Sequence, residues 1–188
     1  MASIALDPAY RRMTVEEFLD LEIEGRAELE DGILYMMSGG TARHAAIIVN
    51  IATALHNKLR GTDCRPMSSD MALRTRENTV RMPDVSVYCG MPLKKEQEQA
   101  KLLGDPRVVI EVLSPSTRGL DLRIKVAEYC ALAGVHAALF VDPDSERVRL
   151  LERTEAGNWS DDWVDAGQDI TIDAIDVTLT SADIFLLD

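Results

Sequence analysis

The chain has 188 residues, of which 46% are apolar and 28% charged, and its formal net charge is −12. This length and apolar content predict a single globular domain over residues 1–188. The excess of acid argues against a protein that coats nucleic acid or binds anionic membranes, because both functions need a basic surface. A cleft with its own basic lining is compatible with this charge. No apolar run is long enough to span a bilayer, and the N-terminal residues lack the pattern of a signal peptide.

The three cysteines, Cys64, Cys89 and Cys130, are widely spaced and form neither a CxxC pair nor a zinc-ligand pattern. An odd number without such a pattern favours reduced thiols. The sequence therefore predicts a cytoplasmic protein without structural disulfides.

The first elements predicted along the chain are a short helix and a hairpin. Thr14 and Glu17 fit a capping box, which opens a helix that ends near Leu21. Residues 27–37 are expected to form a β-hairpin that turns at Asp31-Gly32, because this pair tolerates positive φ angles.

A long helix is predicted next, over residues 41–59. Its apolar stripe at helical spacing consists of Ile48, Ile51, Leu55 and Leu59. Gly61 follows as a suitable C-terminal stop.

The second half of the chain predicts mostly strands. They are expected over residues 71–74, 84–89, 108–113, 138–141 and 147–152. A helix over about residues 119–133 interrupts them, and the tail over residues 170–187 is expected to form two short segments. The sum is an α/β (α+β) fold with a central mixed β-sheet flanked by a few helices.

A carboxylate in the middle of an apolar strand is the first sign of a functional site. In the segment VVIEVL, side chains alternate across the strand, so Val109, Glu111 and Leu113 share one face. Burying an ionised carboxylate is costly unless it is paired, protonated or bound to a metal. Glu111 therefore needs a partner.

Asp84, in the segment MPDVSVY, is a second acid at the start of a predicted strand. Two carboxylates on neighbouring strands form an oxygen-rich corner, and hard cations such as Mg²⁺ prefer oxygen ligands. In the structural alternative, Asp84 caps a turn and Glu111 pairs with a structural arginine. The two acids together favour a metal site.

The predicted helix over residues 119–133 begins with a polar stripe. Arg118, Asp121, Lys125 and Tyr129 follow one another at the spacing of a single helix face. Because this helix starts shortly after Glu111, Lys125 can reach the acidic corner, where an ammonium group offsets charge that develops on a phosphate. In the alternative interpretation, Asp121 and Lys125 form only a surface ion pair.

Four segments resemble one known family. AELEDGILYM, ARH, MPDVSVY and VVIEVLSPSTRGLDLRIKVAEY are similar to the Uma2 family, also called DUF820, which belongs to the PD-(D/E)XK nuclease superfamily. The similarity extends from Glu28 to about Pro143. It implies a restriction-endonuclease-like fold.

The resemblance also implies roles for individual residues. Asp84 and Glu111 match the two metal-binding acids, and the backbone carbonyl of Val112 is expected as a further ligand of Mg²⁺ or Mn²⁺. The superfamily usually has a lysine two residues after the second acid. This chain has Leu113 there, and Lys125 on the helix stands in for the lysine.

Further positions of the family carry less defined roles. Glu28 matches an N-terminal acid and is expected to bind the metal or its water. His44, Asp121 and Tyr129 are accessory candidates. His44 also lies on the apolar stripe of the long helix, so a core histidine with a satisfied hydrogen bond is an equally good interpretation.

Together these residues predict a Mg²⁺- or Mn²⁺-dependent endonuclease that hydrolyses phosphodiester bonds of DNA, as a cytoplasmic homodimer without a membrane partner. Two alternatives stay open at this point. A catalytically silent member would use the fold for binding or assembly, which fits the acidic charge and the lack of a recognisable DNA-binding module. The other alternative is hydrolysis of a small phosphorylated metabolite.

Overall fold

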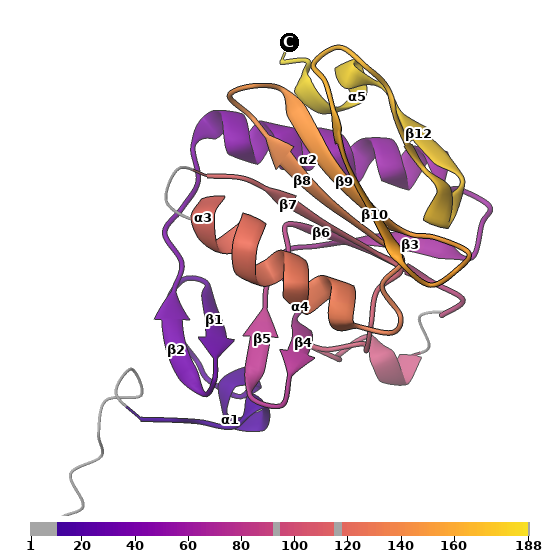
Figure 1. Cartoon of the computed structure of the whole chain (residues 1–188). Helices are drawn as coiled ribbons and strands as arrows, with labels where there is room; N and C mark the ends of the chain where they lie inside the picture. The colour runs from indigo at the N-terminus through magenta and orange to yellow at the C-terminus, as the bar shows by residue number, and fades with distance from the viewer. Residues whose placement is uncertain (1–10, 92–94, 115–117, 188) are drawn as a thin grey trace, which may run out of the picture.

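The computed structural model describes residues 11–91, 95–114 and 118–187. Two sheets organise these residues: a main sheet in the order β10-β9-β8-β7-β6-β3, and a smaller sheet in the order β2-β1-β5-β4. Figure 1 shows the long helix α2 (Ala42–Lys58) on one face of the main sheet, and the helical segment that contains α4 (Val126–Ala131) on the other. The smaller sheet lies below this segment in that view.

The main sheet is mixed. Its strands are β3 (Cys64–Ser68), β6 (Val85–Cys89), β7 (Val108–Val112), β8 (Ala137–Asp142), β9 (Arg147–Arg153) and β10 (Trp159–Val164). Within it, β7 and β8 run parallel and the other neighbours run antiparallel. The predicted central mixed sheet with helices on its faces is confirmed.

Smaller elements surround the main sheet. The smaller sheet consists of β1 (Ala27–Glu30), β2 (Ile33–Met36), β4 (Leu73–Arg76) and β5 (Thr79–Arg81). The other elements are helices α1 (Val15–Leu19), α3 (Arg118–Leu120) and α5 (Ser181–Phe185), 3₁₀ turns at Lys95–Gln97 and Asp173–Ile175, and the strand pair β11 (Ile170–Ile172) and β12 (Val177–Leu179). Within the described ranges, no helix has both the length and the apolar character that crossing a membrane requires.

Alternation along β7 divides the core into two layers. The layer between the main sheet and α2 contains Val108, Ile110 and Val112 of β7 with Ile47, Ile51 and Leu55 of the helix. The opposite layer contains Val109, Leu113 and Tyr129. Glu111 belongs to this second face, so the strand that fills the core also presents a carboxylate to the helical segment.

The helix predicted over residues 119–133 is a continuous helical segment built from three pieces. α3 is followed by a π-helical turn, Asp121–Lys125, and then by α4. The segment ends at Ala131, two residues earlier than predicted, because Leu132 has extended backbone angles. Such π turns inside helices often occur at functional sites. This one buries Asp121 and Lys125 together.

Several local predictions are confirmed at their sequence signals. Thr14 and Glu17 form both hydrogen bonds of a capping box at the start of α1. The hairpin turns at Asp31 and Gly32, whose φ angles are 47° and 82°. Thr41 caps α2 at the predicted start. In contrast, β4 lies two residues further along the chain than the predicted strand over residues 71–74.

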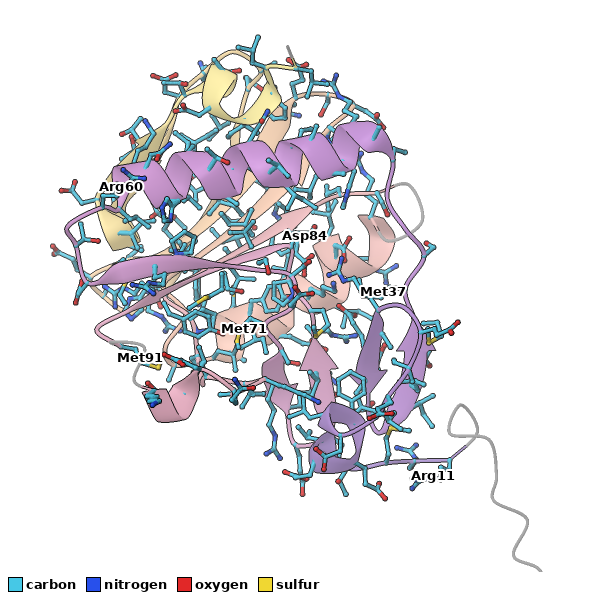
Figure 2. The ribbon with its side chains drawn as sticks, turned by 180° about the vertical axis from the view of Figure 1, so that it is seen from behind. Arg11, Met37, Arg60, Met71, Asp84 and Met91 are labelled. Carbon is cyan, nitrogen blue, oxygen red and sulfur yellow. A yellow bond between two sulfur atoms is a disulfide. The ribbon has the colours of Figure 1, made fainter. Side chains whose placement is uncertain are left out.

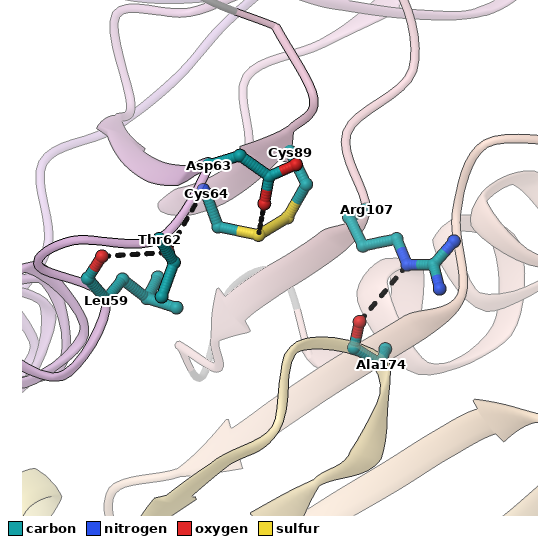
Figure 3. The surroundings of a disulfide bond; sticks show 7 residues. All are labelled: Leu59, Thr62, Asp63, Cys64, Cys89, Arg107 and Ala174. Atoms are coloured by element: carbon teal, nitrogen blue, oxygen red, sulfur yellow. Dashed lines mark hydrogen bonds between the residues drawn. A yellow bond between two sulfur atoms is a disulfide. The ribbon is translucent and has the colours of Figure 1, made fainter.

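The prediction of reduced cysteines is wrong for two of the three. Cys64 of β3 and Cys89 of β6 lie directly opposite each other and form a disulfide, while Cys130 is a free thiol. Figure 3 shows the bond beside Asp63. The error arose because β3 was not predicted, which left Cys64 without a partner strand. Since disulfides are typical of oxidising compartments, the predicted cytoplasmic location loses the support that it drew from reduced thiols.

Candidate active site

Asp84 and Glu111 lie side by side on neighbouring strands. In the antiparallel β6–β7 pair, Val85 is opposite Ile110, and the same register continued by one residue places Asp84 opposite Glu111. Both side chains line a pocket of about 410 Å³, which we call the acid pocket and which is bounded by α2, the helical segment and residues 37–40. Figure 2 shows Asp84 between α2 and the smaller sheet.

Glu111 is buried and is held by the helical segment. Its Oε1 accepts hydrogen bonds from Lys125 Nζ, at 3.0 Å, and from the Tyr129 hydroxyl. Burial raises the pKa of Glu111 to about 8; Lys125 opposes this rise, and neighbouring carboxylates, Asp84 first among them, add to it. Without a bound cation, this raised pKa favours the protonated form of Glu111.

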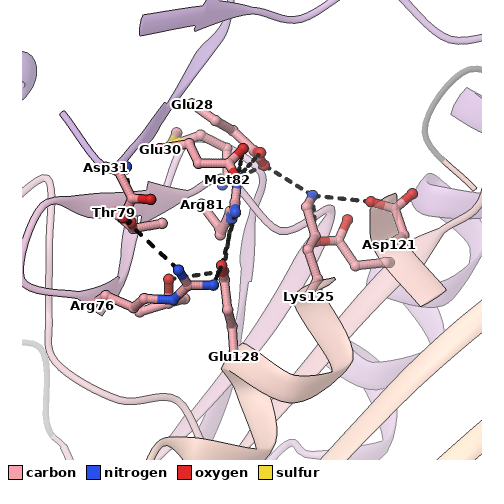
Figure 4. A network of polar contacts seen from close by, with 12 residues as sticks. Glu28, Glu30, Asp31, Arg76, Thr79, Arg81, Met82, Asp121, Lys125 and Glu128 are labelled. Carbon is pink, nitrogen blue, oxygen red and sulfur yellow. Dashed lines mark hydrogen bonds and ion pairs between the residues drawn. The ribbon is translucent and has the colours of Figure 1, made fainter. Parts of the chain in front are cut away.

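Lys125 is the buried cation of the site. Its ammonium nitrogen lies 2.9 Å from Glu28, 3.0 Å from Glu111 and 3.3 Å from Asp121, and Figure 4 shows it between Glu28 and Asp121. Burial alone would lower the pKa of Lys125, but the three carboxylates outweigh burial and raise it. The ammonium group is therefore charged. The alternative of a surface pair between Asp121 and Lys125 is wrong, because both side chains are buried.

Asp84 fixes the backbone that follows Glu111. Its Oδ2 accepts a hydrogen bond of 2.8 Å from the backbone N–H of Val112. Burial raises the pKa of Asp84, and this hydrogen bond and the nearby His44 offset part of the rise. No described residue donates a hydrogen bond to Asp84 Oδ1 or to Glu111 Oε2. One oxygen of each carboxylate is thus available to a ligand from the pocket.

Glu28 of β1 is not among the residues that line the acid pocket. Its Oε1 is 2.9 Å from Lys125 Nζ and accepts a hydrogen bond from the backbone N–H of Met82, while its Oε2 accepts one from Arg81. Both oxygens are therefore occupied by groups of the protein. Glu28 thus contacts Lys125 from outside the acid pocket, and its role as a ligand of the metal or its water stays a prediction.

Sequence reasoning missed a second part of this network. Arg81 of β5 and Glu128 of α4 form a bidentate ion pair with two distances of 2.8 Å, drawn in Figure 4. Glu128 also accepts hydrogen bonds from Thr75 and Arg76. Burial alone would raise the pKa of Glu128, but these donors, led by Arg81, lower it. The available signal was the position of Glu128 three residues after Lys125, on the same helix face.

Arg26 was also missed, and it lines the acid pocket. Its Nη2 donates a hydrogen bond of 3.2 Å to the carbonyl of Met82, while its Nε is buried without a hydrogen bond from the described residues. No described carboxylate lies within ion-pair distance of it. Arg26 therefore brings a guanidinium without a described ion-pair partner to a pocket that is also lined by the acids Asp84, Glu111 and Asp121.

The network holds more buried acid than buried base. Its buried acids are Glu28, Asp84, Glu111, Asp121 and Glu128, and its buried bases are Arg81 and Lys125. Because Glu128 is fully engaged by arginines, the uncompensated negative charge gathers around Asp84, Glu111 and Asp121. Asp121 Oδ1 lies 3.3 Å from Lys125 but at an angle that makes no hydrogen bond. Such a pocket favours the uptake of a proton, which Glu111 accepts, or of a cation.

His44, in the first turn of α2, also lines the acid pocket. Its Nε2 donates a hydrogen bond of 2.8 Å to the carbonyl oxygen of Val112 and lies 3.6 Å from Asp84 Oδ2. The histidine thus has a satisfied hydrogen bond, at the border of the pocket and not in the core. The carbonyl that was expected to bind a cation already has a partner within the protein.

Comparison with known proteins identifies the family. Residues 15–181 match the family model of Uma2, whose description is "Putative restriction endonuclease". The chain belongs to the Uma2 family. The uncharacterized protein slr1290 of Synechocystis sp. is 31% identical over 153 residues, which cover 80% of this chain and 79% of that protein. A second protein of the same organism, the uncharacterized protein sll1609, is 25% identical over 150 residues, with coverage of 78% and 84%.

A solved structure shares the fold of this Uma2 chain. It is described as "a putative nuclease belonging to DUF820 from Anabaena variabilis" and is 20% identical. The TM-score is 0.76, over 92% of this chain and 97% of the other. The predicted restriction-endonuclease-like fold is confirmed by this similarity.

The acid pocket of this Uma2 protein offers two carboxylates, and no larger set of side-chain ligands among the described residues, to a divalent cation. Among residues 11–91, 95–114 and 118–187, no group of three or more His, Cys, Asp and Glu side chains is arranged to hold one ion. Asp84 and Glu111 each have one oxygen that accepts no hydrogen bond from these residues. Since Mg²⁺ usually binds through one or two carboxylates and completes its shell with water and substrate oxygens, the pair fits such an ion.

Most of the predicted site residues come together. Asp84, Glu111, Asp121, Lys125 and His44 line the acid pocket, as does the expected backbone ligand Val112. Tyr129 reaches the site through its hydrogen bond to Glu111. Arg118, at the start of the predicted stripe, is half-exposed and pairs with Asp142 instead. The roles of these residues in catalysis stay predictions.

Proposed function

We propose that this Uma2 protein is a Mg²⁺- or Mn²⁺-dependent endonuclease that hydrolyses phosphodiester bonds in DNA. The observation that carries the proposal is the pair of buried carboxylates, Asp84 and Glu111, which face one pocket beside the buried ammonium of Lys125. Membership of the Uma2 family supports a nuclease-like activity.

The two acids, Asp84 and Glu111, would hold the cation, and the backbone carbonyl of Val112 would be a further ligand. The chemistry that such a cation supplies is a water molecule of lowered pKa and compensation of the charge on the scissile phosphate. Lys125 offsets negative charge that develops on the phosphate during hydrolysis, because its own carboxylate partners keep it protonated. Arg26 binds a phosphate oxygen, since it lines the pocket and has no carboxylate partner among the described residues.

Three further residues orient this group. Glu28 and Asp121 hold the ammonium of Lys125 from two sides, and Tyr129 fixes Glu111 through its hydroxyl. These contacts keep the reacting groups in place before substrate arrives, which removes reorganisation from the reaction step.

Binding or assembly without catalysis is the second candidate function, and one observation favours it. The Val112 carbonyl is engaged by His44, and Glu111 by Lys125 and Tyr129, so the metal-free site is closed by its own hydrogen bonds. A silent member of the family would need no more than this.

A cleavage assay separates the two functions. We expect the protein to nick supercoiled plasmid or to cut single-stranded DNA with Mg²⁺ or Mn²⁺, and to lose cleavage in chelator. Glu111→Gln and Asp84→Asn should each lower the rate about 100-fold or more. Glu152→Gln is the matched control, because this partly buried acid of β9 lies outside the acid pocket. An inactive wild type with both ions and both substrates would support the silent alternative.

The proposal includes a symmetric homodimer. Nucleases that cut both strands commonly use two copies of one site, and two-fold dimers are the commonest oligomers. Analytical ultracentrifugation should show the dimer at micromolar concentration, and a pure monomer would contradict it.

A further inference from the structure

We propose that His44 blocks the cation site: a divalent ion can take both the Val112 carbonyl and Asp84 Oδ2 as ligands only after the imidazole ring has moved away. This inference rests on the proposed function, because it concerns the same site. It assigns a positioning role to a residue for which the sequence left two interpretations open.

His44 and a cation would compete for the same two oxygen atoms. Mg²⁺ binds oxygen ligands at about 2.1 Å. His44 Nε2 lies 2.8 Å from the Val112 carbonyl oxygen, to which it donates a hydrogen bond, and 3.6 Å from Asp84 Oδ2, so the ring lies against both oxygens. An ion bound to both oxygens would meet this hydrogen, which carries partial positive charge. The ring and the ion therefore exclude each other from these two ligands.

The direction of the hydrogen bond follows from its acceptor. A carbonyl oxygen can only accept, so Nε2 of His44 carries the hydrogen. In the metal-free protein this N–H dipole compensates part of the negative charge of Asp84, whose only described hydrogen bond comes from the backbone of Val112. His44 thus occupies the Val112 carbonyl by a hydrogen bond and offsets the charge of Asp84 through space, both more weakly than a coordinated cation would.

Gly40 provides the space in which the ring lies. A Cβ atom added at Gly40 would be 2.5 Å from His44 Nδ1 and 2.9 Å from its Cγ, distances that real structures do not show. A Cβ atom added at the neighbouring Gly39 meets nothing within 4 Å. Neither glycine has a positive φ angle, so the backbone accepts alanine at both positions. Gly40→Ala should therefore push the ring away from Val112, and Gly39→Ala should leave it in place.

A second pocket next to His44 can accommodate the displaced imidazole ring. His44 also lines a second pocket of about 360 Å³, between the start of α2 and the segment that follows β8. This pocket and the acid pocket share His44 and Ser114 in their linings. The ring can therefore leave the acid pocket by rotating toward the second pocket, without unfolding of α2.

Calorimetric titration with Mn²⁺ tests the proposal. We expect His44→Ala and Gly40→Ala to bind Mn²⁺ about fivefold more tightly than the wild type, the factor that corresponds to one lost competing hydrogen bond. Gly39→Ala and His56→Ala, a change at the exposed histidine of the same helix, should match the wild type. In NMR spectra, saturation of the wild type with Mg²⁺ should abolish the hydrogen-bonded Nε2–H signal of His44.

The outcomes are distinct. Equal or weaker Mn²⁺ binding by both His44→Ala and Gly40→Ala would overturn the role of His44 while leaving the metal site intact. If Gly40→Ala does not fold, His44→Ala and the NMR signal still decide the question. Failure of every variant and of the wild type to bind Mn²⁺ would overturn this inference and the proposed function together.

Discussion

At the scale of single residues, Glu111 and Lys125 form a pair in which both pKa values are raised. In an isolated ion pair the pKa of the carboxyl group would fall. Here Lys125 has three carboxylate partners and keeps its proton, whereas Glu111 is buried among further acids and acquires one. The charge of Glu111 therefore depends on whether a cation is present, while the charge of Lys125 does not.

This difference predicts how stability depends on pH. Because the pKa of Glu111 is about 8 in the folded protein and about 4.5 in the unfolded chain, the folded state binds more protons between these values. The free energy of unfolding of the metal-free protein should therefore fall as pH rises from about 4.5 to about 8. Glu111→Gln removes this contribution, so the variant should gain on the wild type by a few kcal/mol across that window.

Urea unfolding in chelator at pH 5, 6.5 and 8.5 measures this difference. A difference between Glu111→Gln and the wild type that stays constant over pH would mean that Glu111 is ionised throughout and acts only as a partner of Lys125.

Removing the charge of Lys125 should destabilise the protein, in contrast to the gain expected for Glu111→Gln. Lys125→Met leaves Glu28, Asp121 and Glu111 without their shared ammonium, and breaking a buried ion pair in this manner costs about 3–5 kcal/mol. The loss should be smaller at pH 5 than at pH 8, since the stranded acids can take up protons. Lys58→Met is the matched control, because its pair with Asp183 is partly exposed and is worth less than about 1 kcal/mol. Similar losses in the two variants would contradict this account.

At the scale of elements, prediction from the sequence succeeded where the signal was local. The apolar alternation of β7 and the spacing of Asp121, Lys125 and Tyr129 placed Glu111 opposite the correct helix face. The strands β3 and β10, both at the edges of the main sheet, were missed. Their sequences, CRPMS and WSDDWV, lack an apolar alternation, because an edge strand is exposed along one side and can carry proline and charge.

Arg81 and Glu128 of the buried network were missed for a different reason. Arg81 lies in a three-residue strand and would look like a surface charge by itself, and Glu128, although it shares the helix face of Lys125, has its partner 47 residues away along the chain. Their burial results from the packing of the smaller sheet against α4, which is a non-local event. Charged residues on the correct face are thus recognisable from sequence only when their partner is close along the chain.

The disulfide on the edge strand β3 should stabilise the main sheet. Cys64 and Cys89 are 25 residues apart, and closing a loop of this size restricts the unfolded chain by about 2–4 kcal/mol. We therefore expect Cys64→Ala with Cys89→Ala to lower the free energy of unfolding by that amount, and reducing agent to have no further effect on the double variant. Cys130→Ala, at the free thiol, should keep the sensitivity to reducing agent. Equal stability of the oxidised wild type and the double variant would contradict the proposed role.

At the scale of the whole molecule, the charge of −12 opposes the approach of DNA. The arginines beside the second pocket do not relieve this, because Arg43 is paired with Glu146 and Arg118 with Asp142. Arg26 differs from them, since it lines the acid pocket without a described carboxylate partner. If the protein acts on DNA as proposed, binding should therefore depend on few phosphate contacts and on a divalent cation that offsets the acids.

This arrangement predicts an unusual salt dependence. Proteins that contact 6–10 phosphates lose about 10³–10⁵ in affinity between 50 and 200 mM salt. For this protein, with Ca²⁺ as the divalent ion, we expect a loss of DNA affinity of less than about tenfold over that range.

Arg26→Gln should weaken DNA binding about tenfold or more, by removing a charge-assisted hydrogen bond to phosphate. Arg74→Gln is the matched control, because Arg74 is exposed on β4 outside the acid pocket. Fluorescence anisotropy with a labelled duplex measures both effects; a steep salt dependence that is unaffected by Arg26→Gln would place the DNA on a different surface from the acid pocket.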